Sequence, residues 1–498
     1  MSEKKLLDIQ NIQQLKPAGF WKAFYEINQV PRGTKNMTQI SKFLANKLRE
    51  LGCEDVQTDN ALNIVAHAKA TDGLEHLPMI TLQAHMDMVC AKEVGSNHNF
   101  LKDPIKMFLE DGWVLADKTT LGGDDGYGVA AILATLSEKV PHGPLEIIFT
   151  TDEEEGLGGV SAIDTSNIRG KYYLNLDGDV ENQCIIGSAG VFAHDITYDL
   201  KRENVEPNMK FFSLSVKGLV GGHSGAEIHR KRINAIQMLV DVLFRSYISI
   251  DNPNIRLISL DGGEFRNSIP AFATIVFAID DLNSNKIKAN INAIMDGYKK
   301  EYIDEESFTF TIEEIKNIKF NPISKENTER ILMGINSIFN GLHVLDIRQI
   351  QMDSSTNMGV ASTTESTIKL DMHTRGNSMN AINRIFYKVE SAVRLSGGKN
   401  TKKDEYKPWP PKFVGNKLAD MVTSKYEELF GKKMNIMSTP GGLEASILLE
   451  KCPSMVSAVN IAPDILAIHS INEKINVASV ERFWKLLCTI YTSIAEIE

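Results

Sequence analysis

The stretch that decides the fold of this chain is Thr81-Leu82-Gln83-Ala84-His85-Met86-Asp87-Met88-Val89. An apolar strand leads into it from Pro78 and ends on a histidine, and an aspartate follows two residues later. Because alternate residues of a strand point to the same face, His85 and Asp87 are expected on one side of the strand end. Open α/β sheets place their sites there. A histidine oriented by a carboxylate is typical of metal sites, although an ordinary solvated strand end explains this stretch alone equally well.

Two further apolar strands end in acids. Residues 144–150 run into Asp152-Glu153-Glu154-Glu155, and residues 172–176 run into Asp177-Gly178-Asp179. A glycine-rich turn over residues 119–128 carries Asp124 and leads into an apolar helix. Glycines let the backbone approach another group closely, and the neighbouring acids argue against a phosphate there. Each piece alone is most simply a surface acidic run or a charged helix cap. Together they indicate one cation site assembled from strand ends.

Length and composition restrict the class of protein. A chain of 498 residues is too long for one ordinary core, so two or more domains are expected. The net charge of −10, from 54 basic and 64 acidic residues, argues against a nucleic-acid or acidic-membrane partner. Five scattered cysteines without a CxxC pair indicate a reducing compartment. The N-terminus has no apolar signal core and the sequence has no 18-residue apolar run, so we expect a cytoplasmic protein.

The chain is predicted to contain an α/β catalytic domain with a mixed sheet, interrupted by an α+β domain. The catalytic domain takes residues 1–190 and 401–498, and the inserted domain takes residues 191–400. An opening helix is predicted over residues 8–29. In the insert, strand-like runs alternate with amphipathic helices, a pattern that indicates two similar β-α-β units.

The chemistry of these side chains favours metal-assisted hydrolysis. Histidine and carboxylate ligands without cysteine suit zinc, cobalt or manganese. The acids outnumber the needs of one ion, so two divalent ions are expected, on the order of 3.5–4 Å apart with a shared carboxylate and water. Such a water attacks an amide carbon if a carboxylate outside the metal shell acts as base. The doublet Glu153-Glu154 offers one ligand and one base. Neither HExxH nor GxSxG occurs in the sequence.

The insert carries two short signals of its own. Residues 218–225 read GLVGGHSG and place His223 between glycines, and residues 262–270 read GGEFRNSIP. A lone histidine in a loop is usually structural or solvated, and glycine-rich surroundings raise the chance of a binding role without making it the favoured one.

The ordered set of motifs resembles a known family. QAHMDMV, TTLGGDDGYG, TDEEEG, LNLDGD, GGHSG and a late AIHS resemble the di-zinc exopeptidases, which include aminoacylases, glutamate carboxypeptidases and dipeptidases. The resemblance is closest to the aminoacyl-histidine dipeptidases, also called Xaa-His dipeptidases or peptidase D, and it covers nearly the whole chain. It implies two zinc ions and hydrolysis of unblocked dipeptides such as β-alanyl-histidine.

The resemblance also implies a role for each residue of the metal site. One zinc ion would be held by His85, Asp124 and Asp177, and the other by Asp124, Glu154 and His469, with Asp124 bridging. Asp87 would orient His85. Glu153 would be the general base.

Further residues would contact the substrate by the same resemblance. His223 would polarise the scissile carbonyl, Asn267 would be a second contact, and Arg375 would bind the substrate carboxylate. The GLE motif would contribute Gly442 and Glu444. The insert would be a lid or dimerisation domain that forms a homodimer, or it would mimic a partner within one chain and leave a monomer.

The sequence departs from the family near the substrate. The last ligand motif reads AIHSINE where GPHSPDE is usual, and Pro440-Gly441 replaces the histidine that usually precedes GLE. Every implied ligand and the base are present. Two alternatives stay open beside the dipeptidase: a related amidohydrolase acting on N-acyl amino acids or tripeptides, and a non-catalytic relative that binds metal or peptide. The retained Glu153 argues against the last.

Overall fold

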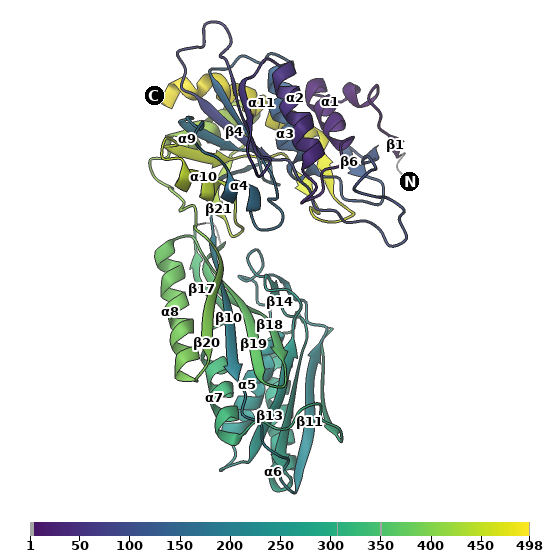
Figure 1. The fold of residues 1–498 in the computed structure, drawn as a ribbon, viewed down its shortest axis with the longest axis vertical. Coiled ribbons are helices and arrows are strands. Elements are labelled where there is room, and N and C mark those ends of the chain that lie inside the picture. Colours follow the sequence, from purple (N-terminus) through teal and green to yellow (C-terminus); the bar gives the residue numbers. More distant parts are fainter. Residues whose placement is uncertain (1–3, 306, 349–350, 498) are drawn as a thin grey trace. The chain divides into compact units, whose positions relative to one another are not determined.

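The computed structural model describes residues 4–305, 307–348 and 351–497 (Figure 1). These residues form two units. The first extends to Ser188 and returns over Trp409–Thr439 and from Leu443 onward. The second comprises Ala189–Pro408 and Pro440–Gly442. The sequence predicts that the inserted domain begins at residue 191 and ends at residue 400.

The first unit is built on an eight-stranded mixed sheet in the order β2-β3-β7-β4-β8-β22-β9-β21. Its strands are β2 (Glu54–Thr58), β3 (Ile64–Ala68), β4 (Ile80–His85), β7 (Leu145–Thr150), β8 (Tyr172–Asn175), β9 (Gln183–Ser188), β21 (Asn435–Thr439) and β22 (Ser457–Asn460). The neighbours β7, β4, β8 and β22 run parallel. Their carboxyl ends therefore meet at one edge, which is where such sheets place their sites.

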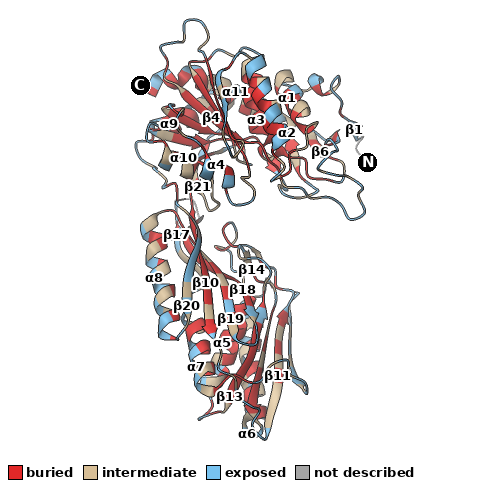
Figure 2. Ribbon diagram, in the orientation of Figure 1, coloured by how far each residue is buried: buried red, intermediate tan, exposed pale blue. Residues whose placement is uncertain are grey.

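Helices and one hydrophobic core complete this unit. The helices are α1 (Ala18–Asn28), α2 (Thr38–Glu50), α3 (Gly123–Ser137), α4 (Gly158–Ala162), α9 (Lys417–Phe430), α10 (Ala445–Lys451) and α11 (Val477–Ser493). A smaller sheet joins β1 (Lys5–Leu6), β5 (Met107–Glu110), β6 (Trp113–Ala116), β24 (Lys474–Asn476) and β23 (Ile465–Leu466). The core packs Phe24 of α1 and Ile132 of α3 with Leu82 of β4 and Leu487 of α11. Figure 2 shows the strands of the large sheet as mostly buried.

The opening helix was predicted to begin at residue 8, and this start is wrong because α1 begins at Ala18. Residues 8–29 contain a short 3-10 turn, Ile12–Gln14, and α1 begins only at Ala18. Pro17 is the residue before the helix. Because proline has no backbone N–H, it cannot continue a helix that would begin at residue 8, although it fits at a helix start.

The second unit is built on one antiparallel sheet in the order β16-β11-β15-β13-β18-β19-β10-β20, with β17 also paired to β18. Its strands are β10 (Gly190–Asp199), β11 (Met209–Lys217), β13 (Ile255–Gly262), β15 (Ala273–Asp280), β16 (Thr309–Ile315), β17 (Gly341–Asp346), β18 (Gln351–Thr363), β19 (Thr367–Gly376) and β20 (Lys399–Tyr406). A two-stranded ribbon pairs β12 (Gly222–His223) with β14 (Ser268–Ile269). The two similar units predicted from the sequence lie within this single sheet, whose neighbouring strands are antiparallel.

This sheet has two halves of like topology. In one half the chain forms β11, α5 (Ala235–Ile248), β13, β15, α6 (Asp281–Glu301) and β16, in the order β16-β11-β15-β13. In the other it forms β10, α7 (Lys325–Ser337), β18, β19, α8 (Met379–Leu395) and β20, in the order β18-β19-β10-β20. Each half is a βαββαβ unit, and the sheet continues from one half to the other where β13 pairs with β18 at Gly262 and Ala361. All four helices share one core with the sheet.

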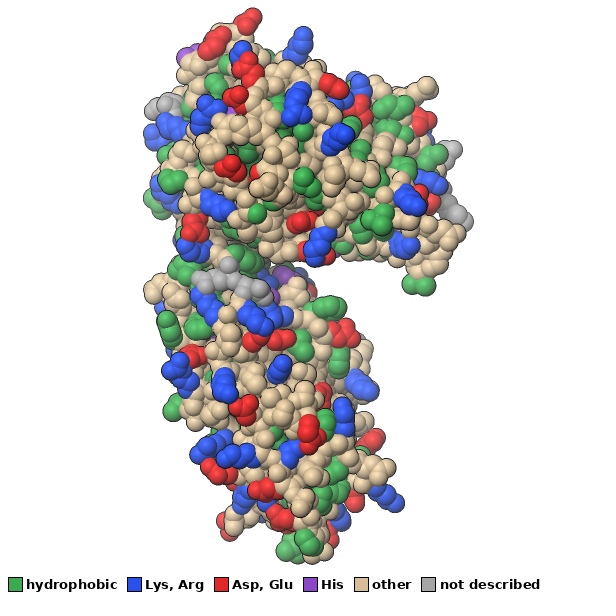
Figure 3. Space-filling view, in the orientation of Figure 1, with side chains coloured by type: hydrophobic (Ala, Val, Ile, Leu, Met, Phe, Trp, Pro, Cys, Tyr) green, Lys and Arg blue, Asp and Glu red, His purple; other side chains and the backbone are tan. Residues whose placement is uncertain are grey.

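Charged side chains of both signs are interspersed on the face of the molecule in Figure 3.

None of the helices in the described ranges combines the length and the apolar character needed to cross a membrane.

Candidate metal centre

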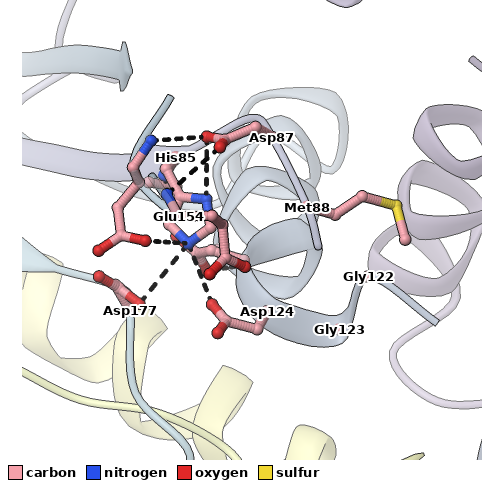
Figure 4. A network of polar contacts seen from close by, with 12 residues as sticks. His85, Asp87, Met88, Gly122, Gly123, Asp124, Glu154 and Asp177 are labelled. Atoms are coloured by element: carbon pink, nitrogen blue, oxygen red, sulfur yellow. Dashed lines mark hydrogen bonds and ion pairs between the residues drawn. The ribbon is translucent and has the colours of Figure 1, made fainter. Parts of the chain in front are cut away.

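Seven predicted residues of the first unit lie together at the carboxyl edge of its sheet. Figure 4 labels His85, Asp87, Asp124, Glu154 and Asp177 among them. His85 ends β4, and Asp87 follows it. Glu153 and Glu154 lie in the turn after β7, and Asp177 follows β8. Asp124 lies in the first turn of α3, and His469 comes from the loop between β23 and β24. The parallel strands bring these segments together because each strand ends at the same edge of the sheet.

One group of ligand atoms surrounds His85. Its Nε2 lies 3.0 Å from Asp124 Oδ1 and 3.9 Å from Asp177 Oδ1. The side chain of His85 is fully buried. Asp87 lies on the other side of the ring, with Oδ1 at 3.4 Å from His85 Nδ1.

A second group surrounds His469. Its Nε2 lies 2.8 Å from Glu154 Oε2 and 3.3 Å from Asp124 Oδ2. Asp124 therefore presents one carboxylate oxygen to each histidine. A carboxylate that bridges two ions has this arrangement.

Asp87 is held firmly from the strand end. Its carboxylate accepts hydrogen bonds from Thr34 Oγ1 at 3.0 Å and from the backbone N–H of Glu153 at 3.1 Å. The carboxylate thus orients His85 and at the same time fixes the start of the turn that carries Glu153.

Burial and hydrogen bonds within the site shift the pKa values of its side chains. Burial raises the pKa of Glu153 well above its ordinary value, and it raises the pKa of Asp177 to about 7. Burial also raises the pKa of Asp124, but hydrogen bonds from His469 and His85 outweigh it and the net shift is downward. Hydrogen bonds to Asp124 and Glu154 raise the pKa of His469 to about 11. The site therefore contains more buried negative charge than its own histidines offset.

The donor set fits divalent cations. His85 forms two candidate triads of ligand atoms, one with Asp124 and Glu154 and one with Asp125 and Asp177. Glu154 Oε1 and Asp177 Oδ2 are buried and have no hydrogen-bond partner among the described residues. Buried carboxylate oxygens without partners are costly unless a cation binds them.

Asp125 is a residue of the site that the sequence did not single out. It is fully buried, and its two oxygens accept the backbone N–H groups of His85 at 3.1 Å and Gly128 at 3.1 Å. These bonds connect the end of β4 to the start of α3. The glycine-rich turn contains two adjacent aspartates, Asp124 and Asp125, and the sequence pattern alone did not show that both belong to the site.

Glu444 lies inside the same unit beneath the strand ends. Its Oε2 accepts hydrogen bonds from Gln83 Nε2 and Thr150 Oγ1, each at 2.5 Å, and the residue is fully buried. Burial raises the pKa of Glu444 to about 8. Gln83 in turn accepts hydrogen bonds from Tyr173 and Asn175 of β8 at 2.6 Å each. Glu444 thus belongs to a buried polar network that joins three strands of the site.

The other four predicted substrate contacts lie in the second unit. Asn267 accepts a backbone hydrogen bond from Ser224, next to His223, at 2.8 Å. Arg375 is 5% exposed and its Nη1 donates to the carbonyl of Pro440 at 3.4 Å, two residues before Gly442. His223 Nδ1 accepts a hydrogen bond from the backbone N–H of Ala226 at 3.1 Å, so the neutral ring carries its proton on Nε2.

Comparison with known proteins places this chain in a family. The family model "Peptidase family M20/M25/M40" matches residues 81–493. The cytosol non-specific dipeptidase of Escherichia coli K12 is 32% identical over 98% of this chain and 99% of its own length. The crystal structure of an aminoacylhistidine dipeptidase from Vibrio alginolyticus has a TM-score of 0.87 and 29% identity, and it covers 98% of both chains.

A more distant structure shares only the fold. The structure of a tripeptidase from Staphylococcus aureus gives a TM-score of 0.59 at 16% identity, over 97% of this chain and 99% of that chain. The comparisons confirm the predicted fold class and the predicted family resemblance. The chain belongs to the peptidase family M20/M25/M40 and is a hydrolase of peptide bonds.

Proposed function

We propose that this peptidase hydrolyses unblocked dipeptides of the Xaa-His type, such as β-alanyl-histidine, with two divalent metal ions and Glu153 as general base. The observation that carries the proposal is the arrangement of Asp124, whose two oxygens lie 3.0 Å from His85 and 3.3 Å from His469. The names of the full-length relatives, a cytosol non-specific dipeptidase and an aminoacylhistidine dipeptidase, support this substrate class.

The proposed ligands divide into two sets that share Asp124. One set is His85, Asp124 and Asp177, and the other is Asp124, Glu154 and His469. Zinc is the proposed metal, with cobalt and manganese as alternatives, because the set has imidazole and carboxylate donors without thiolate. When bound, such ions polarise a carbonyl and lower the pKa of water.

Glu153 carries the proton transfers of the proposed mechanism. Its Oε2 lies 3.9 Å from His85 Nε2, and burial raises its pKa well above the ordinary value. A carboxylate of raised pKa takes the proton from the attacking water and returns it to the amine that leaves. Asp87 orients His85 and, through the backbone N–H of Glu153, also fixes the base.

The residues of the second unit are proposed to bind the substrate. The proton on Nε2 suits His223 as a donor to the scissile carbonyl oxygen, where negative charge develops. Arg375 suits a carboxylate, since its Nε is buried and has no hydrogen-bond partner among the described residues. Asn267 and Gly442 are proposed as further contacts.

The protein as a whole is proposed to be cytoplasmic and to form a homodimer. A cytoplasmic location agrees with the name of the Escherichia coli relative and with the scattered cysteines. A homodimer through the second unit is the proposed assembly, and sedimentation equilibrium would distinguish it from a monomer.

A substrate panel tests the proposed function. The panel contains β-alanyl-histidine, glycyl-histidine, dileucine, a tripeptide and an N-acetylated dipeptide. Cleavage of the free dipeptides alone supports the proposal. Cleavage of the acetylated compound or the tripeptide moves the function to the related amidohydrolase, and tight metal binding without any cleavage identifies a non-catalytic relative.

A further inference from the structure

The loop that carries His469 ends on a buried glutamate. Glu473 is 2% exposed, and its carboxylate accepts four consecutive backbone N–H groups of the turn that leads into α3. Oε2 accepts from Leu121 at 2.7 Å and Gly122 at 3.0 Å, and Oε1 accepts from Gly123 at 2.7 Å and Asp124 at 3.2 Å. The first N–H groups of a helix lack partners within the helix and attract negative charge. Gly123 and Asp124 open α3 and Leu121 and Gly122 precede it, and Glu473 satisfies all four N–H groups with a side chain from a segment about 350 residues away in the chain.

A buried arginine holds the same turn from its other side. Arg32 is 2% exposed, and it donates to the carbonyl of Gly122 at 2.5 Å and to the carbonyl of Asp87 at 3.1 Å. Gly122 has φ +69°, and a Cβ there would lie 2.3 Å from Arg32 Nη2. Only glycine fits this turn without displacing Arg32. The turn that leads to Asp124 is therefore held by two side chains of opposite charge. Glu473 accepts its N–H groups, and Arg32 donates to the carbonyl of Gly122.

His469 depends on this anchoring more than His85 does. The side chain of His85 is fully buried, whereas that of His469 is 48% exposed. Packing alone therefore holds His469 less firmly. Two residues of the loop have left-handed backbone conformations, Ala467 at φ +56° and His469 at φ +61°. Residues other than glycine adopt this conformation only when their surroundings hold them in it. The N–H of Glu473 donates to the carbonyl of Ser470 at 3.1 Å, so the anchor acts on the residue next to His469.

We infer that Glu473 is a positioning residue, whose carboxylate couples the loop of His469 to the turn of Asp124 and so sets the distance between these two ligands of one metal ion. This inference rests on the proposed two-metal centre. It assigns a role to the last residue of the AIHSINE motif, which neither the ligand set nor the general base uses. The ion bound by Asp124, Glu154 and His469 should depend on Glu473 more than the ion bound at His85.

The test compares Glu473→Gln with wild type and with Glu481→Gln, an exposed glutamate on α11. A carboxamide accepts two of the four N–H groups, but its own NH₂ faces the other two. We expect the affinity for one of the two zinc ions to fall by about tenfold to a hundredfold, while the other ion binds nearly as in wild type. Calorimetric titration of the metal-free protein with zinc measures both sites without turnover.

Kinetics separate positioning from a general structural effect. Glu473→Gln should lower kcat at limiting zinc and leave KM unchanged, and excess zinc should restore kcat. The melting temperature of the metal-free protein should fall by only a few degrees, because the carboxamide leaves two buried N–H groups without an acceptor. Loss of both ions together, with no rescue by zinc, would show a merely structural role and overturn the inference.

A second variant keeps the test decisive if Glu473→Gln does not fold. Ser470 Oγ donates to the carbonyl of Ala467 at 2.7 Å, within the same loop. Ser470→Ala should weaken the same zinc ion to a smaller degree, and unchanged affinity for both ions would contradict the inference. If wild type itself binds fewer than two ions, the proposed function fails. If wild type binds two ions and the variants behave like it, only the role of Glu473 fails.

Discussion

At the scale of single residues, the site depends on Asp124. This carboxylate lies against both histidines, and its backbone N–H is bound by Glu473. Strand ends and the glycine-rich turn pointed to His85, Asp124, Glu154 and Asp177 as ligands, whereas His469 came only from the family resemblance. The sequence could not predict Arg32 or the buried position of Glu444, because both depend on contacts between segments far apart in the chain.

The general base is tested by Glu153→Gln. A carboxamide cannot take the proton from water, so we expect kcat to fall by about a hundredfold to ten-thousandfold. Both metal ions should still bind. Glu155→Gln, an exposed change in the same acidic run, is the matched control and should keep wild-type kcat. A Glu153→Gln enzyme as fast as wild type would refute the proposed base.

Arg375→Met tests the carboxylate contact. Hydrogen bonds to charged groups contribute about 1.5–3 kcal/mol, so KM for dipeptides should rise by about tenfold to a hundredfold. The loss should be much smaller for a dipeptide amide, which has no terminal carboxylate. Arg394→Met on α8, where the side chain is 77% exposed, is the control. An equal rise in KM for both substrates would contradict the assignment.

Glu444 can be tested as a substrate contact or as part of the buried network. If its charge binds the free amine of the substrate, Glu444→Gln raises KM. If it only joins β4 and β7, the carboxamide oxygen still accepts from Gln83 and Thr150, and KM and kcat stay near wild type. Because Glu444 is fully buried, we expect the second result, together with loss of metal affinity in Glu444→Ala.

At the scale of elements, the apolar strands and amphipathic helices could be predicted, and the polar edge could not. β20 reads KNTKKDEY, which has no hydrophobic pattern, and it is an edge strand paired to β10. Backbone pairing of this kind leaves no mark in the side-chain sequence. The two halves of the second sheet were indicated by repeated strand-helix patterns, but their union into one antiparallel sheet depends on long-range pairing.

Strand β10 gives the second unit a pH-dependent stability. His194 is fully buried, with Nε2 at 2.8 Å from Thr374 Oγ1, and burial lowers its pKa to about 4. The unfolded chain takes up this proton near pH 6.5, so the folded state loses stability as the pH falls from 6.5 toward 4 and gains nothing above 6.5. The expected loss between pH 7 and pH 5 is about 2 kcal/mol.

Urea unfolding at these two pH values, followed by circular dichroism, measures that loss. His194→Gln cannot be protonated, so its stability should change less between pH 7 and pH 5 than that of wild type. The same pH dependence in both proteins would show that His194 does not contribute.

At the scale of the whole molecule, the chain combines a unit that carries the candidate metal ligands with an inserted unit that carries four of the five predicted substrate contacts. The length of the chain indicated two or more domains, because 498 residues exceed one ordinary core. The structure also assigns Pro440–Gly442 to the second unit, although GLE reads as one motif. Gly442 and Glu444 thus belong to different units, a division that no local pattern in the sequence indicates.

The central claim is that two metal ions at the carboxyl edge of the first sheet drive hydrolysis. The most direct measurement strips the enzyme with a chelator and then follows β-alanyl-histidine cleavage and bound zinc together as zinc is added back. The account predicts no cleavage without metal and full activity only when two zinc ions per chain are bound. Full activity of the stripped enzyme, or a maximum reached at a single bound ion, would contradict it.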